Sequence, residues 1–196
     1  MSKLWKKIFL GAAITAGLAL IFFGFILIRA LSILETRNEL LNYKNATASV
    51  ILSYDGQLIG KVFNENRTNV EFEQLPKHLI AALIATEDIR FYKHSGIDVK
   101  SLFRVFFKTL LLQKESSGGG STITQQLAKN MFGRISSGLF PLLVNKTKEF
   151  LLARKLERNF SKDEILTLYL NTVPFGENVF GIEAASLHYF NKKVKE

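Results

Sequence analysis

The sequence ATEDIRFYKHSGID occupies residues 85–98 and gathers acids, bases and two aromatic residues at the end of an apolar run. That run begins after Leu75-Pro76, and proline suits the first turn of a helix because its fixed φ is already helical. No helix breaker follows before Glu87, so we predict a helix that ends where the cluster begins. Titratable side chains gathered at a helix end are typical of an active-site segment.

The first two acids of the cluster, Glu87 and Asp88, are expected to have different roles. On a helix, Glu87 and Asp88 point about 100° apart and cannot share one proton, so one can be catalytic while the other is structural. Glu87 precedes Phe91, and partial desolvation there would suit a general base, although a helix-terminal acid in solvent explains the position equally well. His94 could act as an acid or base, but its place two residues before Gly96 favours a hydrogen bond that holds a turn.

A second polar segment, GGGSTITQQLAKN, follows at residues 118–130. Ser121 or Thr122 can cap a helix there, because hydroxyl side chains accept hydrogen bonds from free amides in the first turn. Gln125 and Gln126 lie four and three positions before Lys129, which places at least one amide on the lysine's face of that helix. This segment supplies polar partners that a structural core would not require.

Composition limits the class of protein. The chain has 196 residues, of which 47% are apolar, and this is ample for one domain with a buried core. Lys and Arg exceed Asp and Glu by 26 to 17, giving a net charge of +9 and a pI near 9.7 that suit an anionic partner such as nucleic acid, phospholipid or a phosphorylated substrate. The chain has no cysteine, which excludes disulfides and thiolate chemistry, and its three histidines lack metal-ligand spacing.

Residues 8–28 read IFLGAAITAGLALIFFGFILI, in which only Thr15 is polar. A bilayer-spanning helix needs about 20 such residues, whereas the apolar part of a cleaved signal peptide has about 7–15. We therefore predict an uncleaved transmembrane anchor. Three lysines precede it and Arg29 is the nearest charge after it, so the positive-inside rule makes residues 1–7 a cytoplasmic tail. The rest of the chain would lie on the outer side of the membrane, away from nucleic acid.

After the anchor we expect a stalk at residues 29–46 and one domain at residues 47–196. Apolar side chains at helical spacing in residues 30–44 are compatible with a helical stalk, but a plain spacer is the preferred interpretation. The pattern at residues 48–63, two apolar runs separated by Asp55-Gly56, predicts a small β-hairpin.

The rest of the domain reads mainly as helix. SLFRVFFKTLLLQK at 101–114 predicts either a helix lying partly in the lipid interface or a buried core helix, with equal support. SSGGG at 116–120 predicts a mobile functional loop. An apolar stripe runs through 141–160, SKDE at 161–164 is a capping box that starts another helix, and residues 183–190 resume helical composition.

Five segments resemble the signatures of a known family when they are taken together and in order. They are EDxxFxxHxG at 87–96, GxSTIxQQLxKN at 119–130, KxxE at 146–149, SKDEIL through YLN at 161–171, and GIEAA through YF at 181–190. These are similar to the five signatures of peptidoglycan glycosyltransferases, the glycan-polymerising domains of class A penicillin-binding proteins and their monofunctional relatives.

The resemblance implies a mainly α, lysozyme-like bilobed domain with a small N-terminal β-hairpin and one transmembrane helix. The implied reaction joins lipid II units into β-1,4 glycan strands on the outer face of the membrane, with inversion at the donor anomeric carbon and release of polyprenyl pyrophosphate. The implied partners are lipid II, the growing glycan strand, membrane phospholipid and other cell-wall synthesis proteins. No tightly bound cofactor is implied, whereas Mg²⁺ or Mn²⁺ is compatible with pyrophosphate chemistry.

The resemblance also implies roles for individual residues. It makes Glu87 the general base and Glu149 a second catalytic carboxylate, while Lys129 and Lys146 neutralise the leaving pyrophosphate. The residues that match substrate-binding positions are Asp88, Phe91, His94, Ser121, Thr122, Gln126, Lys129 and Lys146. Glu149 could orient Lys146, bind a bridging metal ion or help to position the donor sugar, and metal ligands are otherwise left unassigned.

The chain departs from the family's pattern in two places. Asn145 stands where the family commonly has an arginine, which shifts the expected phosphate contacts to Lys146, Lys148 or Arg154. The chain also stops at Glu196, where the family's domain normally continues, so we expect the 47–196 domain to be incomplete at its C-terminus.

Two other kinds of protein remain to be distinguished. A lysozyme-like enzyme that cleaves glycan also relies on a glutamate, but it needs neither clustered lysines nor an interfacial helix. A non-catalytic, membrane-anchored scaffold for cell-wall assembly would bind its partners regardless of Glu87 and Glu149.

Overall fold

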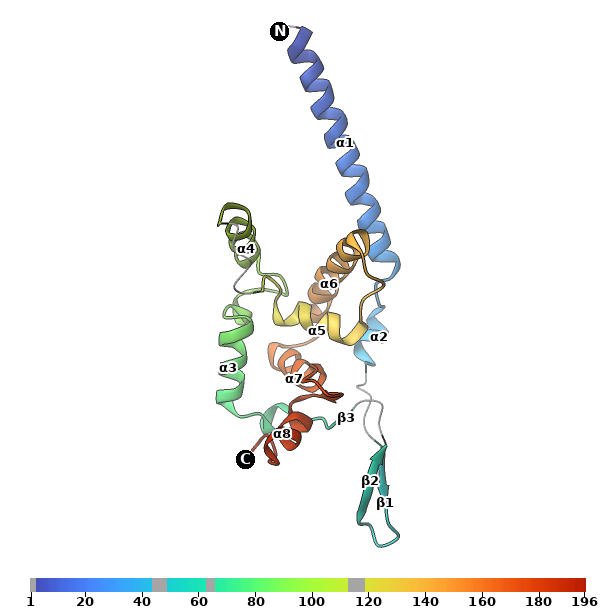
Figure 1. Cartoon of the computed structure of the whole chain (residues 1–196), viewed down its shortest axis with the longest axis vertical. Coiled ribbons are helices and arrows are strands. Elements are labelled where there is room, and N and C mark those ends of the chain that lie inside the picture. The colour runs from blue at the N-terminus through green and yellow to red at the C-terminus, as the bar shows by residue number, and fades with distance from the viewer. Residues whose placement is uncertain (1–2, 44–48, 63–65, 113–118) are drawn as a thin grey trace.

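The computed structural model describes residues 3–43, 49–62, 66–112 and 119–196, and the chain is mainly helical (Figure 1). A long helix extends away from a group of shorter helices, and a pair of strands projects from the opposite end of that group. The elements are α1 (Lys3–Ser32), α2 (Arg37–Leu41), β1 (Ser49–Leu52), β2 (Leu58–Val62), β3 (Asn66–Arg67), η1 (Phe72–Gln74), α3 (Lys77–Glu87), η2 (Phe91–Lys93), α4 (Val99–Leu112), α5 (Ile123–Phe132), α6 (Leu139–Asn159), α7 (Lys162–Thr172), β4 (Val179–Phe180) and α8 (Ile182–Phe190).

Helix α1 contains the predicted apolar span. In the part of the chain that is described, one helix is long and apolar enough to cross a membrane, over Trp5–Ser32. Most of its large apolar side chains are exposed, as a helix surrounded by lipid would require. Its last turns lie beside the beginning of α6 (Figure 1).

The main core lies where α5 contacts both α6 and α7. Apolar side chains at helical spacing on these three helices are buried together, including Leu127, Leu156 and Leu166. Phe91, from the opening cluster, is completely buried in the same core. Helix α3 packs only part of one face against it and has no fully buried residue.

The segment that joins α1 to the domain is packed, so its interpretation as a plain spacer is wrong. Leu40 is buried in the main core, and the ring of Tyr43 lies 5.6 Å from that of Phe132. Thr36 caps α2, and the Glu39 side chain returns to the Thr36 backbone amide in a capping box. This short helix needs such contacts, because five residues of helix are not stable alone.

The strands form two small pairs. β1 and β2 are antiparallel, with Ser49 opposite Val62. β3 and β4 are parallel, with Asn66 opposite Val179, so the chain leaving the hairpin is held beside the C-terminal region. The second pair is not indicated by any pattern in the sequence.

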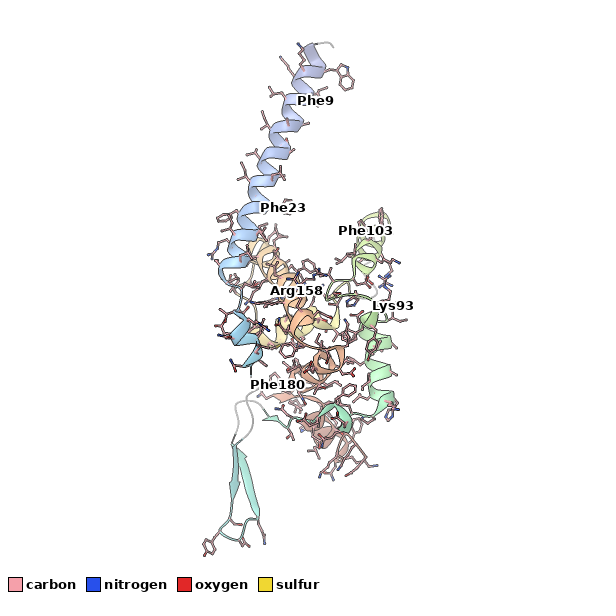
Figure 2. The ribbon with its side chains drawn as sticks, turned by 180° about the vertical axis from the view of Figure 1, so that it is seen from behind. Phe9, Phe23, Lys93, Phe103, Arg158 and Phe180 are labelled. Atoms are coloured by element: carbon pink, nitrogen blue, oxygen red, sulfur yellow. The ribbon has the colours of Figure 1, made fainter. Side chains whose placement is uncertain are left out.

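The expected helices are present, with some changes. α3 ends at Glu87 as predicted, and Pro76 is its N-cap residue. The predicted capping box at the start of α7 is confirmed: the Ser161 hydroxyl accepts from the Glu164 amide, and the Glu164 carboxylate accepts from the Ser161 amide at 2.7 Å. In α4, Phe103 (labelled in Figure 2) and Phe107 are more than half exposed, which favours the lipid-interface interpretation of residues 101–114 over the buried-core one; residues 113–114 lie outside the described residues.

The predicted mobile loop at 116–120 can be followed only in part. Residues 116–118 lie outside the described residues. Gly119 and Gly120 belong to the described part and lead into α5.

Gly96 is where the opening cluster meets α6. Its φ is +86°, and a Cβ there would lie 2.8 Å from the carbonyl carbon and oxygen of Ala153. The Gly96 carbonyl oxygen accepts hydrogen bonds from the Thr122 hydroxyl at 2.8 Å and from the side-chain amide of Gln125 at 3.1 Å. Only glycine fits this backbone conformation in this space.

We expect Gly96→Ala to lower the free energy of unfolding by roughly 2–4 kcal/mol, because it adds backbone strain to a clash with backbone atoms of α6. Denaturant unfolding in detergent, followed by circular dichroism, measures the loss. Gly56→Ala is the matched control, since Gly56 also has a positive φ (+80°) but its added Cβ would meet nothing within 4 Å. Equal losses in the two variants would contradict a steric role for Gly96.

Asp98 begins α4 and is buried. Its carboxylate accepts from the Ser101 amide at 3.1 Å and the Ser101 hydroxyl at 2.6 Å, and it pairs with Arg90. Burial raises the pKa of Asp98, but the hydrogen bonds from Ser101 and Arg90 outweigh it and lower the pKa from 3.8 to about 2. The carboxylate therefore stabilises the fold above about pH 4, and this contribution is lost as the pH falls from about 4 to about 2.

We expect Asp98→Asn to destabilise the protein at neutral pH and to make little difference near pH 2, because asparagine can still cap the helix but carries no charge. The free energies of unfolding of the wild type and of the Asp98→Asn variant are measured and compared across this pH range. A difference that stays constant with pH would show that the charge of Asp98 contributes nothing.

Candidate active site

An open cavity of about 320 Å³ lies where the end of α3 faces the start of α5. Its walls combine the opening cluster with the second polar segment, which the sequence places more than twenty residues apart. The lining residues are Ala85, Thr86, Glu87, Asp88, Ile89, Asp98, Ser101, Arg104, Gly119, Gly120, Ser121, Thr122 and Gln126. Five of the predicted site residues are therefore brought together here: Glu87, Asp88, Ser121, Thr122 and Gln126.

Asp88 joins the two walls of the cavity. Its side chain is 4% exposed, and one carboxylate oxygen accepts from His94 Nε2 at 2.9 Å and from the backbone amide of Ile123 at 3.2 Å. That amide is one of the free N–H groups at the start of α5, where the helix dipole favours a negative charge. Asp88 therefore holds the end of α3 against the start of α5.

His94 is a structural residue in this arrangement. Its Nδ1 accepts from the Gly96 amide at 3.2 Å, so its proton is on Nε2, where it donates to Asp88. The favoured interpretation of His94, a hydrogen bond that holds a turn, matches these contacts. Phe91 is equally structural: its ring packs in the core, with the Lys162 ammonium 4.2 Å from the ring centre.

Glu87 is exposed to the cavity, which favours the solvent-exposed helix end over partial desolvation, the two interpretations that the sequence left open. The reason is that α3 has no fully buried residue and only its inner face meets the core. The Gln126 amide donates to Glu87 Oε2 at 2.8 Å, and the Gln126 oxygen accepts from the Tyr169 hydroxyl at 3.1 Å. Burial, together with the charge of Glu87, raises the pKa of Tyr169 to about 12, so this hydroxyl remains a donor.

Glu149 lies at the centre of a cluster of basic side chains. It is 4% exposed, and its two oxygens accept from Arg134 at 2.9 Å and from Lys146 at 2.7 Å. Lys146 also donates to the Ser121 hydroxyl at 3.1 Å. Because Ser121 lines the cavity of Glu87, the Lys146–Glu149 pair adjoins the same cavity.

Thr122 and Lys129 differ in burial, one at the N-cap and the other in the last turn of α5. The Thr122 hydroxyl caps the helix by accepting from the Gln125 amide at 3.2 Å, and its side chain is buried. Lys129 is partly exposed and forms no ion pair with any described residue. It shares the partly exposed face of α5 with Gln126, as the spacing predicted.

Of the three basic residues expected to contact phosphate, only Lys146 lies at Glu149. Lys148 is buried and pairs with Glu35, and Arg154 approaches the Ser95 carbonyl, so neither joins Lys146 at Glu149. Asn145 is buried and accepts from the Ile135 amide at 3.1 Å.

The second cation at Glu149 is Arg134, which the sequence reasoning missed. It follows Gly133, whose φ of +65° ends α5, and lies in the turn before α6. A turn has no helical periodicity, so its sequence does not show in which direction a side chain points. The available signal for Arg134 was the presence of a basic residue close after the second signature.

The described residues contain no group of three or more His, Asp or Glu side chains that could hold a metal ion. Both oxygens of Glu149 already accept from basic side chains. The carboxylates of the site are thus not arranged as a protein cage for a cation.

Comparison with known proteins gives a consistent result. Residues 55–196 match the transglycosylase family. Similar proteins include penicillin-binding protein 1F of Bacillus subtilis, 41% identical over 97% of this chain and 26% of that protein, and penicillin-binding protein 1A of Escherichia coli, 43% identical over 74% of this chain and 17% of that protein. A biosynthetic peptidoglycan transglycosylase of Nitrosomonas eutropha is 47% identical over 62% of this chain and 48% of that protein.

The chain spans about a quarter of the length of the Bacillus subtilis relative. The family match covers both walls of the cavity as well as α6 with Lys146 and Glu149. The chain therefore belongs to the transglycosylase family.

Proposed function

We propose that this chain is a peptidoglycan glycosyltransferase that polymerises lipid II into β-1,4 glycan strands. The observation that carries the proposal is the joining of two unlike groups at one cavity: an exposed carboxylate, Glu87, and a set of cations around Glu149 that reaches the cavity through Ser121. Glycosyl transfer from a pyrophosphate donor requires a base for the acceptor and positive charge for the leaving group. Family membership supports the same reaction.

Glu87 acts as the general base. Gln126 engages Oε2, so among the described residues Oε1 keeps its lone pairs for a substrate proton. Oε1 takes the proton of the acceptor 4-hydroxyl while the hydroxyl oxygen forms a bond to the donor anomeric carbon. At the same time the bond from this carbon to the pyrophosphate oxygen breaks, and its electron pair stays with the departing pyrophosphate. A single displacement of this kind inverts the anomeric centre. Desolvation of Glu87 then comes from bound substrate rather than from the fold.

The leaving pyrophosphate is stabilised by Lys146, Arg134 and Lys129. A carboxylate beside pyrophosphate would repel it, but the charge of Glu149 is already matched by two cations. We therefore assign Glu149 the task of orienting Lys146 towards Ser121, which keeps the ammonium at the cavity before substrate arrives. Positive groups fixed in advance stabilise developing charge without reorganising during the reaction.

A divalent cation such as Mg²⁺ or Mn²⁺ has a limited place in this proposal. The site residues do not fit a resident ion, because the oxygens of Glu149 are engaged by basic side chains. Charge neutralisation is instead assigned to the chain's own cations, Lys146, Arg134 and Lys129.

The proposed location is the outer face of a bacterial cytoplasmic membrane, with α1 as a single-pass anchor and the N-terminus inside. The exposed Phe103 and Phe107 of α4 would then contact lipid at the interface, near the lipid-linked substrate. Phospholipid, the growing strand and other cell-wall synthesis proteins are the proposed partners. A bilobed, lysozyme-like organisation around the cavity belongs to the same proposal.

We expect Glu87→Gln to reduce polymerisation of lipid II by roughly 100-fold or more, since general-base catalysis contributes about that much. The variant should keep its fold, because Glu87 is exposed and glutamine can still bond to Gln126. Glycan formation by the full chain in detergent measures the effect, and Glu73→Gln, an exposed acid on η1, is the control. Retained activity in Glu87→Gln would refute its assignment as the base, and cleavage of finished glycan by the wild type would favour a hydrolase.

We expect Lys129→Ala to lower the rate on lipid II by on the order of 100-fold, because one positive group is lost from the leaving-group site. Lys195→Ala, another exposed lysine, removes the same charge from the C-terminal segment. Initial rates at several lipid II concentrations separate the two variants. If both lost activity equally, Lys129 would be only a solvated surface residue.

A further inference from the structure

Helix α6 has a second functional face that the proposed reaction does not use. Lys146 and Glu149 lie towards α5 and the cavity. A different set of residues, spaced by four or seven positions and therefore on one face, meets the N-terminal segment. This set, the anchor face of α6, consists of Phe140, Val144, Lys148, Lys155 and Asn159.

The first part of the anchor face packs against α1. The rings of Phe140 and Phe25 are stacked with centres 5.7 Å apart. Val144 is buried in one cluster with Ile26 and Ala30, which are the two buried apolar side chains of α1 among the described residues. The contact therefore lies at the outer end of the apolar span.

The second part of the anchor face binds the linker between α1 and α2. The Lys148 ammonium pairs with Glu35 Oε1 at 2.5 Å, and these side chains are only 8% and 16% exposed. Lys155 donates to the backbone carbonyl of Glu35, and Arg37 donates to the Asn159 side chain at 2.9 Å. Removing one partner of a buried ion pair leaves a charge without compensation, so Glu35–Lys148 is a strong constraint on where α6 lies.

The distance from this contact to the reacting groups is short. Glu149 follows Lys148 in the chain and lies five residues after Val144, which is about 8 Å along a helix. The headgroup region of one leaflet is about 5–8 Å thick. A site tied to the outer end of the anchor in this way lies at the depth where a membrane-held polyprenyl pyrophosphate presents its phosphates.

We infer that Glu35 and Lys148 are positioning residues: they fix the depth and orientation of α6, and with it Lys146 and Glu149, relative to the membrane. The inference rests on the proposed function, because it concerns a donor whose pyrophosphate is held at the bilayer surface. Such a donor cannot follow a displaced site. A water-soluble donor with a short prenyl chain can reach the site at any depth.

The test compares two donors in full-length protein reconstituted into phospholipid vesicles. We expect Glu35→Gln to lower polymerisation of vesicle-embedded lipid II by roughly 10-fold, since small misplacements of catalytic groups are costly. Its rate on a short-chain lipid II analogue should equal that of the wild type, which also shows that the variant is folded. Lys148→Met should have the same effect. Glu39→Gln is the control, because Glu39 lies on α2, four residues after Glu35, but is exposed and among the described residues its carboxylate accepts hydrogen bonds only from Thr36.

A second measurement reads the depth of α6 directly. The chain has no cysteine, so Leu142→Cys, at an exposed position of α6, can carry a single fluorophore. Quenching by lipids brominated at set depths should give one depth for the otherwise native chain and a different or broader one after Glu35→Gln.

An unchanged label depth, together with equal use of both donors relative to the wild type, overturns the inference. So does an equal loss on both donors at unchanged depth, which indicates a purely structural role. If the wild type polymerises neither donor, the proposed function fails, whereas the label depth still decides whether Glu35 positions α6.

Discussion

The fold of the site depends on the buried carboxylate of Asp88, which accepts hydrogen bonds from His94 and from the first backbone amide of α5. A buried charge is costly unless it is fully hydrogen-bonded, so the three segments that supply or receive these bonds must assemble together. Gly96 completes the junction, because its carbonyl receives two side chains of the segment that starts α5. Glu87 can remain exposed and reactive because its neighbour carries the structural task.

Helix α6 likewise carries a buried carboxylate that holds other side chains of the site in place. Glu149 is buried but matched by Arg134 and Lys146, and Lys146 reaches the cavity through Ser121. The arrangement explains how a negative residue can belong to the proposed phosphate-binding site. It also shows why Arg134 matters in a chain that has Asn145, since the guanidinium reaches Glu149 from the turn rather than from the helix.

Many of the helices and their caps could be predicted from the sequence, because local patterns determine them. The α7 capping box and the end of α3 at Glu87 follow from short-range chemistry.

Contacts between distant segments could not be predicted in this way. The pairing of Gln126 with Glu87 was approached only through a resemblance, since residues 39 positions apart meet through tertiary packing. The exposure of Glu87 could not be decided from the sequence, because an apolar run does not tell how much of a helix the core covers. The packed linker was missed because Glu35 finds Lys148 across 113 residues, and no local pattern records such a pair.

The stacking of Phe140 on Phe25 has a consequence for the membrane itself. A spanning helix accommodates a thicker or thinner bilayer by tilting, at a cost of fractions of a kcal/mol per Å of mismatch. Here α1 packs on α6, and α6 packs on α5, so a tilt of a membrane-spanning α1 would carry the helices of the core with it. The orientation of the proposed active site at the bilayer surface would then depend on bilayer thickness, without any ligand binding to the protein.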